Sequence, residues 1–236
     1  MPLPRRARRA AAMVAGTAAF ALGLIAFAHT PAARPLLAAI GRLPGGHAGC
    51  PLGYDRPATG AQRERIRRNL SANLRGARPA ARRPALVFDL DLTREADVVA
   101  FMKGRGIACH PGSGMADLVC DGVPGRVLGS REVAGVDRNL WFTFGDGHRL
   151  VSLVAVSKTS APGPISDGYQ AATREIAERV GQPSTVSGDA DSSFLSGGAL
   201  RQASAEFRFS NYYASARATN LGNGFLLTEE YRALVD

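Results

Sequence analysis

Two cysteines, Cys109 and Cys120, constrain the fold of this chain more than any other feature of its sequence. They flank a Pro-Gly-Ser-Gly segment at 111–114, which is typical of a tight turn. The segments 107–110 and 118–123 are predicted to form paired strands, and opposite residues of such a pair hold their Cβ atoms about 4.5–5.5 Å apart. We therefore predict a hairpin that is closed by a disulfide between the two cysteines.

A helix is predicted immediately before this hairpin. Thr93 is a suitable N-cap, because its hydroxyl can accept a hydrogen bond from a backbone N–H at the start of a helix. Gly104 and Gly106 are expected to end the helix, since glycine is the usual residue just past a helix C-terminus. The helix is expected to bury one stripe of apolar residues: Val98, Val99, Phe101 and Met102.

The rest of the chain from Pro84 onward alternates predicted strands with one further helix. Two apolar runs flank Gly145-Asp146-Gly147-His148, which is a strong hairpin signal. A linker rich in proline and glycine is expected at 158–168, then a helix at 169–180 that ends at Gly181. A polar loop is expected at 184–198. The predicted strands are 85–92, 140–144, 150–157, 203–209, 212–218 and 225–231.

These elements predict an α+β fold, in which two helices pack on one face of an antiparallel β-sheet. The sequence also suggests two similar halves, each with a helix followed by a hairpin. The aromatic pattern Phe142-Thr143-Phe144 in one half corresponds to Phe207-Arg208-Phe209 in the other. Residues 84–236 are long enough to enclose one hydrophobic core, and we assign them to a single globular domain.

The first 83 residues are predicted to export and tether this domain. Four arginines within residues 1–9 precede an uncharged apolar run at 10–28, which reads as a transmembrane anchor or a cleaved signal peptide. The arginines stay on the cytoplasmic side in either case. We therefore expect a periplasmic domain on a single-pass inner-membrane anchor, or a secreted one. Residues 29–83 are predicted to be an Arg/Ala/Pro/Gly-rich tether in which Cys50 stays unpaired.

Charge separates the tether from the domain. Residues 1–84 hold 15 Lys and Arg against 2 acidic residues, a net charge of +13, whereas residues 85–236 carry −4. A nucleic-acid-binding domain needs its basic patch on the folded part, so no nucleic acid is expected as a partner. A helix is predicted at 60–76 within the tether. It lies either on an anionic membrane surface or against the domain, through three aliphatic residues: Ile66, Leu70 and Leu74.

One motif admits an enzymatic interpretation. Asp89-x-Asp91-x-Thr93 follows an apolar segment and resembles the first motif of the haloacid-dehalogenase-type phosphatases. The resemblance implies Asp89 as nucleophile, Asp91 as acid/base and a Mg²⁺ ion beside them. The structural alternative has both aspartates facing water, Thr93 capping the helix, and the apolar residues pointing inward: Phe88, Leu90 and Leu92. That family also needs a parallel sheet, whereas hairpins follow here.

Few other residues suggest chemistry. A metal could be held by residues around the cysteine hairpin, namely Cys109, His110, Cys120 and His148, but their spacing fits no zinc template and export favours the disulfide. Ser113 lies in a turn and lacks the spacing of a nucleophile elbow. We predict no catalytic residue, no metal and no cofactor.

Short motifs carry a family resemblance over the chain from residue 50. They are Cys-Pro-Leu-Gly-Tyr-Asp at 50–55, Gly-x-x-Cys at 106–109, Leu-x-Cys at 118–120 and Ala-Thr-Asn-Leu-Gly at 218–222. They resemble uncharacterised exported proteins of GC-rich proteobacteria, a family with no known activity. A helix, Gly-x-Pro at 181–183 and antiparallel strands are similar to the outer-membrane-assembly lipoproteins and the β-lactamase-inhibitor-like modules, which implies a non-catalytic binding domain.

Location and resemblance together predict a membrane-anchored or exported envelope protein. Its membrane contact is expected through residues 10–28, and its domain is expected to be a protein-interaction module with an envelope protein as partner. The alternative is a small secreted hydrolase, phosphatase-like through Asp89, Asp91 and Thr93.

Overall fold

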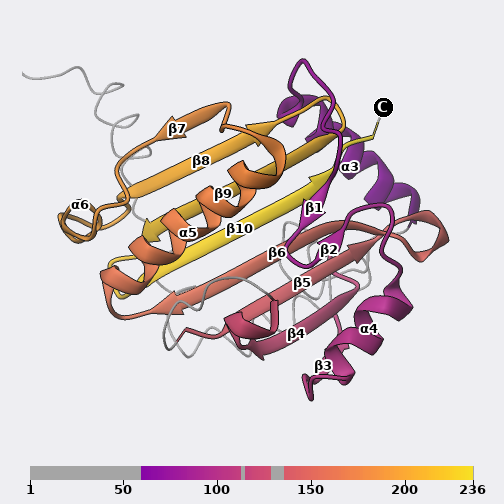
Figure 1. Ribbon diagram of the computed structural model, residues 1–236, viewed down its shortest axis with the longest axis horizontal. Helices are drawn as coiled ribbons and strands as arrows, with labels where there is room; N and C mark the ends of the chain where they lie inside the picture. The colour runs from indigo at the N-terminus through magenta and orange to yellow at the C-terminus, as the bar shows by residue number, and fades with distance from the viewer. Residues whose placement is uncertain (1–59, 113–114, 129–135, 236) are drawn as a thin grey trace, which may run out of the picture. The chain divides into compact units, whose positions relative to one another are not determined.

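The computed structural model describes residues 60–112, 115–128 and 136–235. They belong to one compact unit, 57–236, built on an eight-stranded antiparallel sheet with strand order β3-β4-β5-β6-β10-β9-β8-β7 (Figure 1). The predicted α+β class and antiparallel sheet are therefore confirmed. The strands of this sheet are β3 (Cys109–Pro111), β4 (Leu118–Val123), β5 (Arg138–Phe144), β6 (Leu150–Thr159), β7 (Thr185–Ser187), β8 (Gln202–Arg208), β9 (Tyr212–Asn220) and β10 (Phe225–Ala233).

The remaining elements are short or helical. The helices are α3 (Gly60–Leu74), α4 (Glu95–Lys103), α5 (Pro162–Val180) and α6 (Ser192–Ser196). Two strands, β1 (Pro84–Ala85) and β2 (Phe88–Asp89), form a separate hairpin. Two 3-10 turns are η1 (Gly125–Leu128) and η2 (Asp146–His148).

The sheet is built from two halves of the same topology. In each half a helix precedes four antiparallel strands: α4 precedes β3 to β6, and α5 precedes β7 to β10, with α6 between β7 and β8. The last strands of the halves, β6 and β10, pair from Thr159↔Phe225 to Ser152↔Arg232. The first strands, β3 and β7, lie at the two edges and have three residues each. The halves thus join at one central strand pair, and only short strands remain at the edges, which limits edge-to-edge association.

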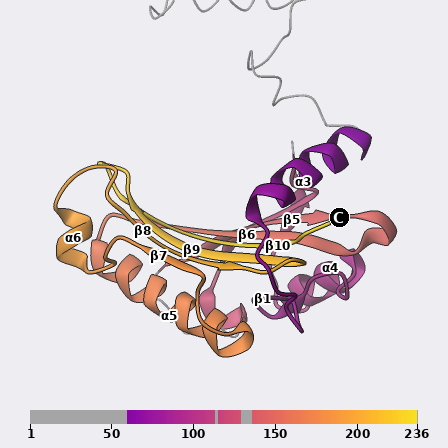
Figure 2. The ribbon, with the colours of Figure 1, turned by 90° about the horizontal axis from the view of Figure 1, so that it is seen from above.

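One face of the sheet carries the hydrophobic core. Alternate strand residues point to this face, and helix α5 packs across β9, β10 and β6 on top of them (Figure 2). The helix buries residues that recur every three or four positions, which is the spacing of an amphipathic helix: Ile165, Tyr169, Ala172 and Ile176. The core on the strands includes Leu140, Phe142, Leu153, Ala155, Phe207, Ala216 and Leu227.

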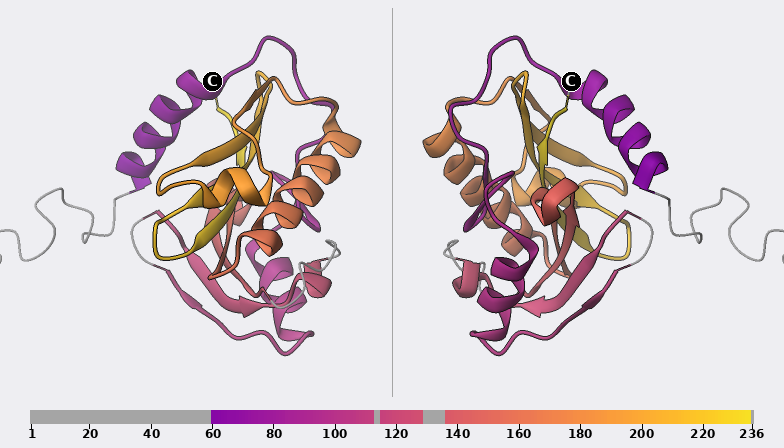
Figure 3. Two further views of the ribbon diagram at one scale, coloured as in Figure 1. Left: turned by 90° about the vertical axis from the view of Figure 1, so that its left-hand side faces the viewer. Right: turned by 90° about the vertical axis from the view of Figure 1, so that its right-hand side faces the viewer.

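Helix α3 lies on the opposite side of the sheet from α5 (Figures 2 and 3). The helices of the domain are therefore not confined to one face. Ser71 is 2% exposed, and its hydroxyl accepts a hydrogen bond from the Val235 N–H at 3.4 Å. Ile66 is 41% exposed, so the prediction that it docks the helix is wrong. The hydrogen bond at Ser71 is therefore one described contact that holds α3 against the domain.

The segment after α3 approaches the β8–β9 turn closely. The Gly76 N–H donates to the Phe209 carbonyl at 3.1 Å, and the Ala80 N–H donates to Asn211 Oδ1 at 2.8 Å. A Cβ at Gly76 would collide with the Arg208 carbonyl. Glycine is therefore needed where the chain passes this turn.

The expected strand at 85–92 is a tight hairpin instead. Leu86 adopts a φ of 55°, which turns the chain between β1 and β2. The Tyr212 hydroxyl donates to the Pro84 carbonyl at 2.6 Å and fixes the hairpin against the core. Phe88 and Leu90 are buried as predicted, but Leu92 is 70% exposed. The alternation therefore ends before Leu92.

Three further expectations are corrected locally. Arg94, and not Thr93, is the N-cap of α4, and its N–H donates to Asp97 Oδ2 at 3.0 Å. The expected linker at 158–168 is the end of β6 and the first turns of α5, which begins at Pro162 because proline suits the first turn of a helix. The expected loop at 184–198 contains β7 and α6.

A buried ion pair lies in the core beside the central strand pair. Arg138 on β5 and Glu229 on β10 approach to 3.1 Å, with side chains 4% and 3% exposed. The Tyr231 hydroxyl donates to the second oxygen of Glu229 at 2.9 Å. Burial and the Glu229 charge both raise the pKa of Tyr231, which therefore stays a neutral donor. β6 lies between the two strands, and the attraction between the two charges offsets the free-energy cost of removing each of them from water.

Removing one member of this pair should destabilise the domain strongly. Arg138→Met leaves Glu229 buried without its counter-ion, and we expect a loss of about 3–5 kcal/mol in the free energy of unfolding in urea. Arg138→Met with Glu229→Gln keeps an acceptor for Tyr231 and should recover most of the loss. A cost below about 1 kcal/mol for the single variant would contradict this account of the core.

Within the described residues, no helix is long and apolar enough to cross a bilayer. The predicted anchor or signal at 10–28 and Cys50 lie outside the described residues.

Candidate functional site

The sheet face turned away from α5 is a candidate binding surface, called here the open face. One row of neighbouring side chains crosses five strands on it: Val119, Trp141, Val154, Glu230 and Ser215. Val119, Val154 and Glu230 are half-buried, although α3 is the one helix of residues 60–112, 115–128 and 136–235 that lies on this side (Figures 2 and 3). The open face is thus a sheet surface whose side chains are partly accessible.

Trp141 is the most prominent side chain of the open face. It is the one tryptophan of the sequence, and it is 43% exposed. Val119 on β4 and Val154 on β6 flank it as cross-strand neighbours. Tryptophan is enriched among the residues that dominate binding energy in protein interfaces, because it supplies a large apolar area and a polar N–H. An exposed tryptophan between β-branched neighbours is therefore a candidate centre of a binding patch.

The open face becomes charged toward β8. Arg208 Nη2 lies 2.7 Å from Glu206 Oε2, and Arg232 is paired with Glu230 on the adjoining part of the face. Paired charges of this kind are common at the rim of protein interfaces, around a more apolar centre. The open face has this composition, with its apolar part over β4 to β6 and its ion pairs over β8 to β10.

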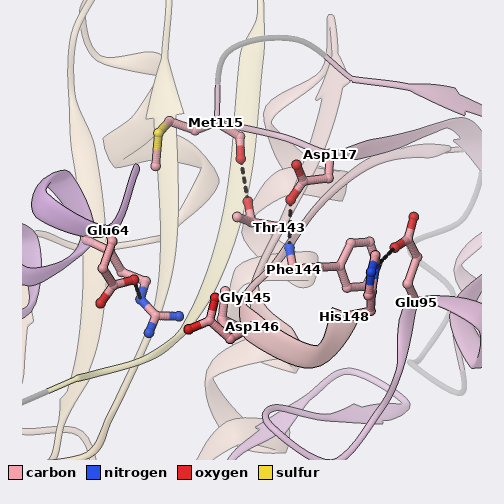
Figure 4. A pocket seen from close by; sticks show the side chains of 11 residues that line it. Glu64, Glu95, Met115, Asp117, Thr143, Phe144, Gly145, Asp146 and His148 are labelled. Carbon is pink, nitrogen blue, oxygen red and sulfur yellow. Dashed lines mark hydrogen bonds and ion pairs between the residues drawn. The ribbon is translucent and has the colours of Figure 1, made fainter. Parts of the chain in front are cut away.

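A hollow of about 480 Å³ lies beside the open face, between α3, the start of α4 and the β5–β6 connection (Figure 4). His148 Nδ1 lies 2.7 Å from Glu95 Oε2, and Glu64 Oε2 lies 3.2 Å from Arg67 Nε. Asp117 accepts a hydrogen bond from the Phe144 N–H at 2.8 Å. Figure 4 shows these contacts on the walls of the hollow, which is acidic in character.

The hollow shows no catalytic arrangement among the described residues that line it. Thr143 is the one hydroxyl side chain among the described lining residues, and this hydroxyl donates to the Met115 carbonyl at 2.7 Å and not to a base. Covalent catalysis needs a nucleophile within hydrogen-bond reach of a base. Among residues 60–112, 115–128 and 136–235, no group of three or more His, Cys, Asp or Glu side chains is placed to hold a metal.

The three residues of the phosphatase-like motif, Asp89, Asp91 and Thr93, make contacts within the protein itself. Asp89 Oδ2 lies 3.1 Å from Arg82 Nη2, and Asp91 Oδ2 lies 2.5 Å from Arg83 Nη1. The Thr93 hydroxyl accepts a hydrogen bond from the Asp89 N–H at 3.1 Å. Each carboxylate thus faces its own arginine, and every described strand pairing is antiparallel, unlike the parallel sheet that the phosphatase interpretation requires.

The predicted cysteine pair is joined in the structure. Cys109 and Cys120 are opposite residues of β3 and β4, their Cα atoms are 4.2 Å apart, and a disulfide links them. His110, next to this bond, lies 3.0 Å from Asp121, whereas His148 contacts Glu95. Hydrogen bonds to the Pro111 carbonyl and then to Asp121 raise the pKa of His110. The two cysteines considered as metal ligands are thus bonded to each other, and the two histidines contact different carboxylates. Ser113 lies outside the described residues.

The sequence predicts the strand that carries Trp141, but Trp141 is not among the predicted site residues. The strand predicted at 140–144 lies within β5, where Leu140 and Phe142 are both fully buried. Because strand residues alternate between faces, Trp141 between them had to point to the opposite face. That alternation was the available signal for the open face.

Comparison with known proteins adds no relative: no family model, no curated protein and no solved structure matches the chain.

Loss of the disulfide should weaken the domain without dismantling it. Cys109→Ser opens a loop of about 11 residues, and the chain-entropy model then predicts a loss of about 3 kcal/mol in unfolding free energy. Cys120 should become reactive to alkylation after unfolding. Cys50→Ser serves as the control and should leave the unfolding transition unchanged. A non-reduced peptide that links Cys50 to either other cysteine would contradict this pairing.

Proposed function

We propose that this chain is a non-catalytic envelope protein whose α+β domain binds another envelope protein through the open face. The observation that carries this proposal is Trp141, which is 43% exposed and flanked by Val119 and Val154 on the open face. A tryptophan with apolar cross-strand neighbours suits a binding hot spot, because tryptophan is enriched among the residues that dominate interface binding energy.

The chemistry of the domain supports a binding role over hydrolysis. Asp89 and Asp91 are each paired with an arginine, so neither is poised as an unpaired nucleophile toward a substrate. The hollow beside the open face offers carboxylates and His148, but its one hydroxyl is held by a backbone carbonyl. The earlier resemblance to binding modules such as the β-lactamase-inhibitor-like proteins agrees with this role.

The proposed location is the extracytoplasmic side of the inner membrane. Arginines at 5–9 and the apolar run at 10–28 support an anchor whose following domain is exported, or a signal whose cleavage releases it. The Cys109–Cys120 disulfide is compatible with such an oxidising compartment. The domain itself is mildly acidic, which agrees with a protein partner and not with nucleic acid.

The substitution Trp141→Asp should weaken binding of the partner protein. We expect recovery of the main partner protein from crosslinked membranes to fall at least about tenfold, because loss of a hot-spot residue costs about 2 kcal/mol or more of binding. Val186→Asp is the matched control: Val186 is 60% exposed, lies on edge strand β7 and pairs with Ala205 of the core face. Equal losses for the two variants, or no loss for Trp141→Asp, would contradict the assignment.

Topology can be tested separately. An alkaline phosphatase reporter fused after Asp236 should be active in a bacterial host, since that enzyme matures only in an oxidising compartment. A second kind of reporter, one that is active only in the cytoplasm, should be inactive at the same site. Activity of that reporter would reverse the proposed orientation, and the open-face proposal would lose its extracytoplasmic location.

A further inference from the structure

Between α3 and the open face lies a cavity that shares Trp141 and Val154 with the proposed partner surface and adds residues of α3 and β10. Its volume is about 250 Å³, and its floor consists of cross-strand neighbours on three strands. Trp141 faces Val154 across β5 and β6, and Ser152 on β6 is opposite Arg232 on β10. Several adjoining strands therefore hold the floor of the cavity in place.

The roof and one wall come from parts of the chain that are distant in sequence. Arg67 and Ser71 stand one turn apart on α3 and line the cavity from above, whereas Met115 lines it from the segment between β3 and β4. The Thr143 hydroxyl donates to the Met115 carbonyl at 2.7 Å, and the buried Ser71 hydroxyl bonds to the backbone of Val235. These bonds hold both the wall and the roof against the sheet.

The lining combines an apolar body with positive charge. Most of the described lining residues are apolar, and two arginines, Arg67 and Arg232, are its charged members, with no carboxylate among them. The counter-ions of the two arginines, Glu64 and Glu230, are absent from that lining. Ligand sites commonly pair an apolar wall with a few convergent polar groups. A guanidinium pairs best with a carboxylate, which it can bind through two parallel hydrogen bonds.

We propose that this cavity binds a small amphipathic carboxylate. Its apolar body lies on Trp141 and Val154, and its carboxylate lies at Arg67 and Arg232. The volume limits the ligand, because about 250 Å³ corresponds to roughly eight water molecules at about 30 Å³ each. Ligands of about ten non-hydrogen atoms fit this limit, and octanoate has that size.

The sole tryptophan makes the cavity testable by fluorescence. Octanoate should shift the emission of Trp141 to shorter wavelength in the full-length chain, kept free of detergent, as the alkyl chain displaces water from the indole. We expect saturation with a Kd of about 1 mM or below for a ligand of this size. Octylammonium, with the same chain and the opposite charge, should produce no saturable shift.

Two variants separate the ligand site from a general effect on the fold. Arg67→Gln and Arg232→Gln should each weaken octanoate binding by about tenfold, because each removes a charge-assisted hydrogen bond. Lys158→Gln is the matched control, since Lys158 is exposed on β6 and points to the same face outside the cavity. Arg232 lies on a central strand, so its variant reports on the cavity even if Arg67→Gln loosens α3.

The outcomes are decisive for the proposal. Saturable octanoate binding that Arg232→Gln weakens and Lys158→Gln preserves supports the carboxylate site. No saturable shift up to about 10 mM, equal binding of octylammonium, or unchanged affinity in both arginine variants would overturn it. The measurement needs no partner protein, so its failure is distinct from a failure of the open-face proposal.

Discussion

The pairing of β6 with β10 is the interaction on which the rest of this structure depends. It joins the last strands of two halves that each consist of a helix and four antiparallel strands, and it turns two small sheets into one. The buried Arg138–Glu229 pair spans the same place, from β5 to β10 across β6. Replacing either side of this junction would leave a long strand edge unpaired and a buried charge uncompensated, both of which are costly.

A single continuous sheet has consequences for its two faces. The core face is closed by α5 and by the aromatic contacts of the β1–β2 hairpin, where the ring of Phe88 packs edge-on against Phe101 and Phe142. On the open face α3 is the one helix among the described residues, and the buried Ser71 hydroxyl binds the Val235 N–H at its contact with the domain. The side chains between these elements are therefore available for ligands. The two proposals place a partner protein and a small carboxylate on overlapping parts of one surface, which meet at Trp141.

The sequence predicted regular elements better than it predicted their surroundings. Alternation correctly located β4, β5, β6, β8, β9 and β10, and the spacing of Cys109 and Cys120 located their disulfide. It failed where tertiary contacts decide the conformation. The Leu86 turn depends on the distant hydroxyl of Tyr212, and the docking of α3 depends on Ser71, whose partner Val235 lies at the other end of the chain. The pattern of neighbouring residues in the sequence does not predict contacts between residues this far apart in the chain.

The central claim is that a partner protein occupies the open face, and photo-crosslinking in cells tests it most directly. A crosslinking amino acid in place of Thr228, at the centre of the open face, should give one discrete adduct with a partner of the cell envelope. The same group in place of Gln170, exposed on α5 on the opposite side, should give none. Adducts of equal yield from both positions, or an adduct from Gln170 alone, would contradict the account.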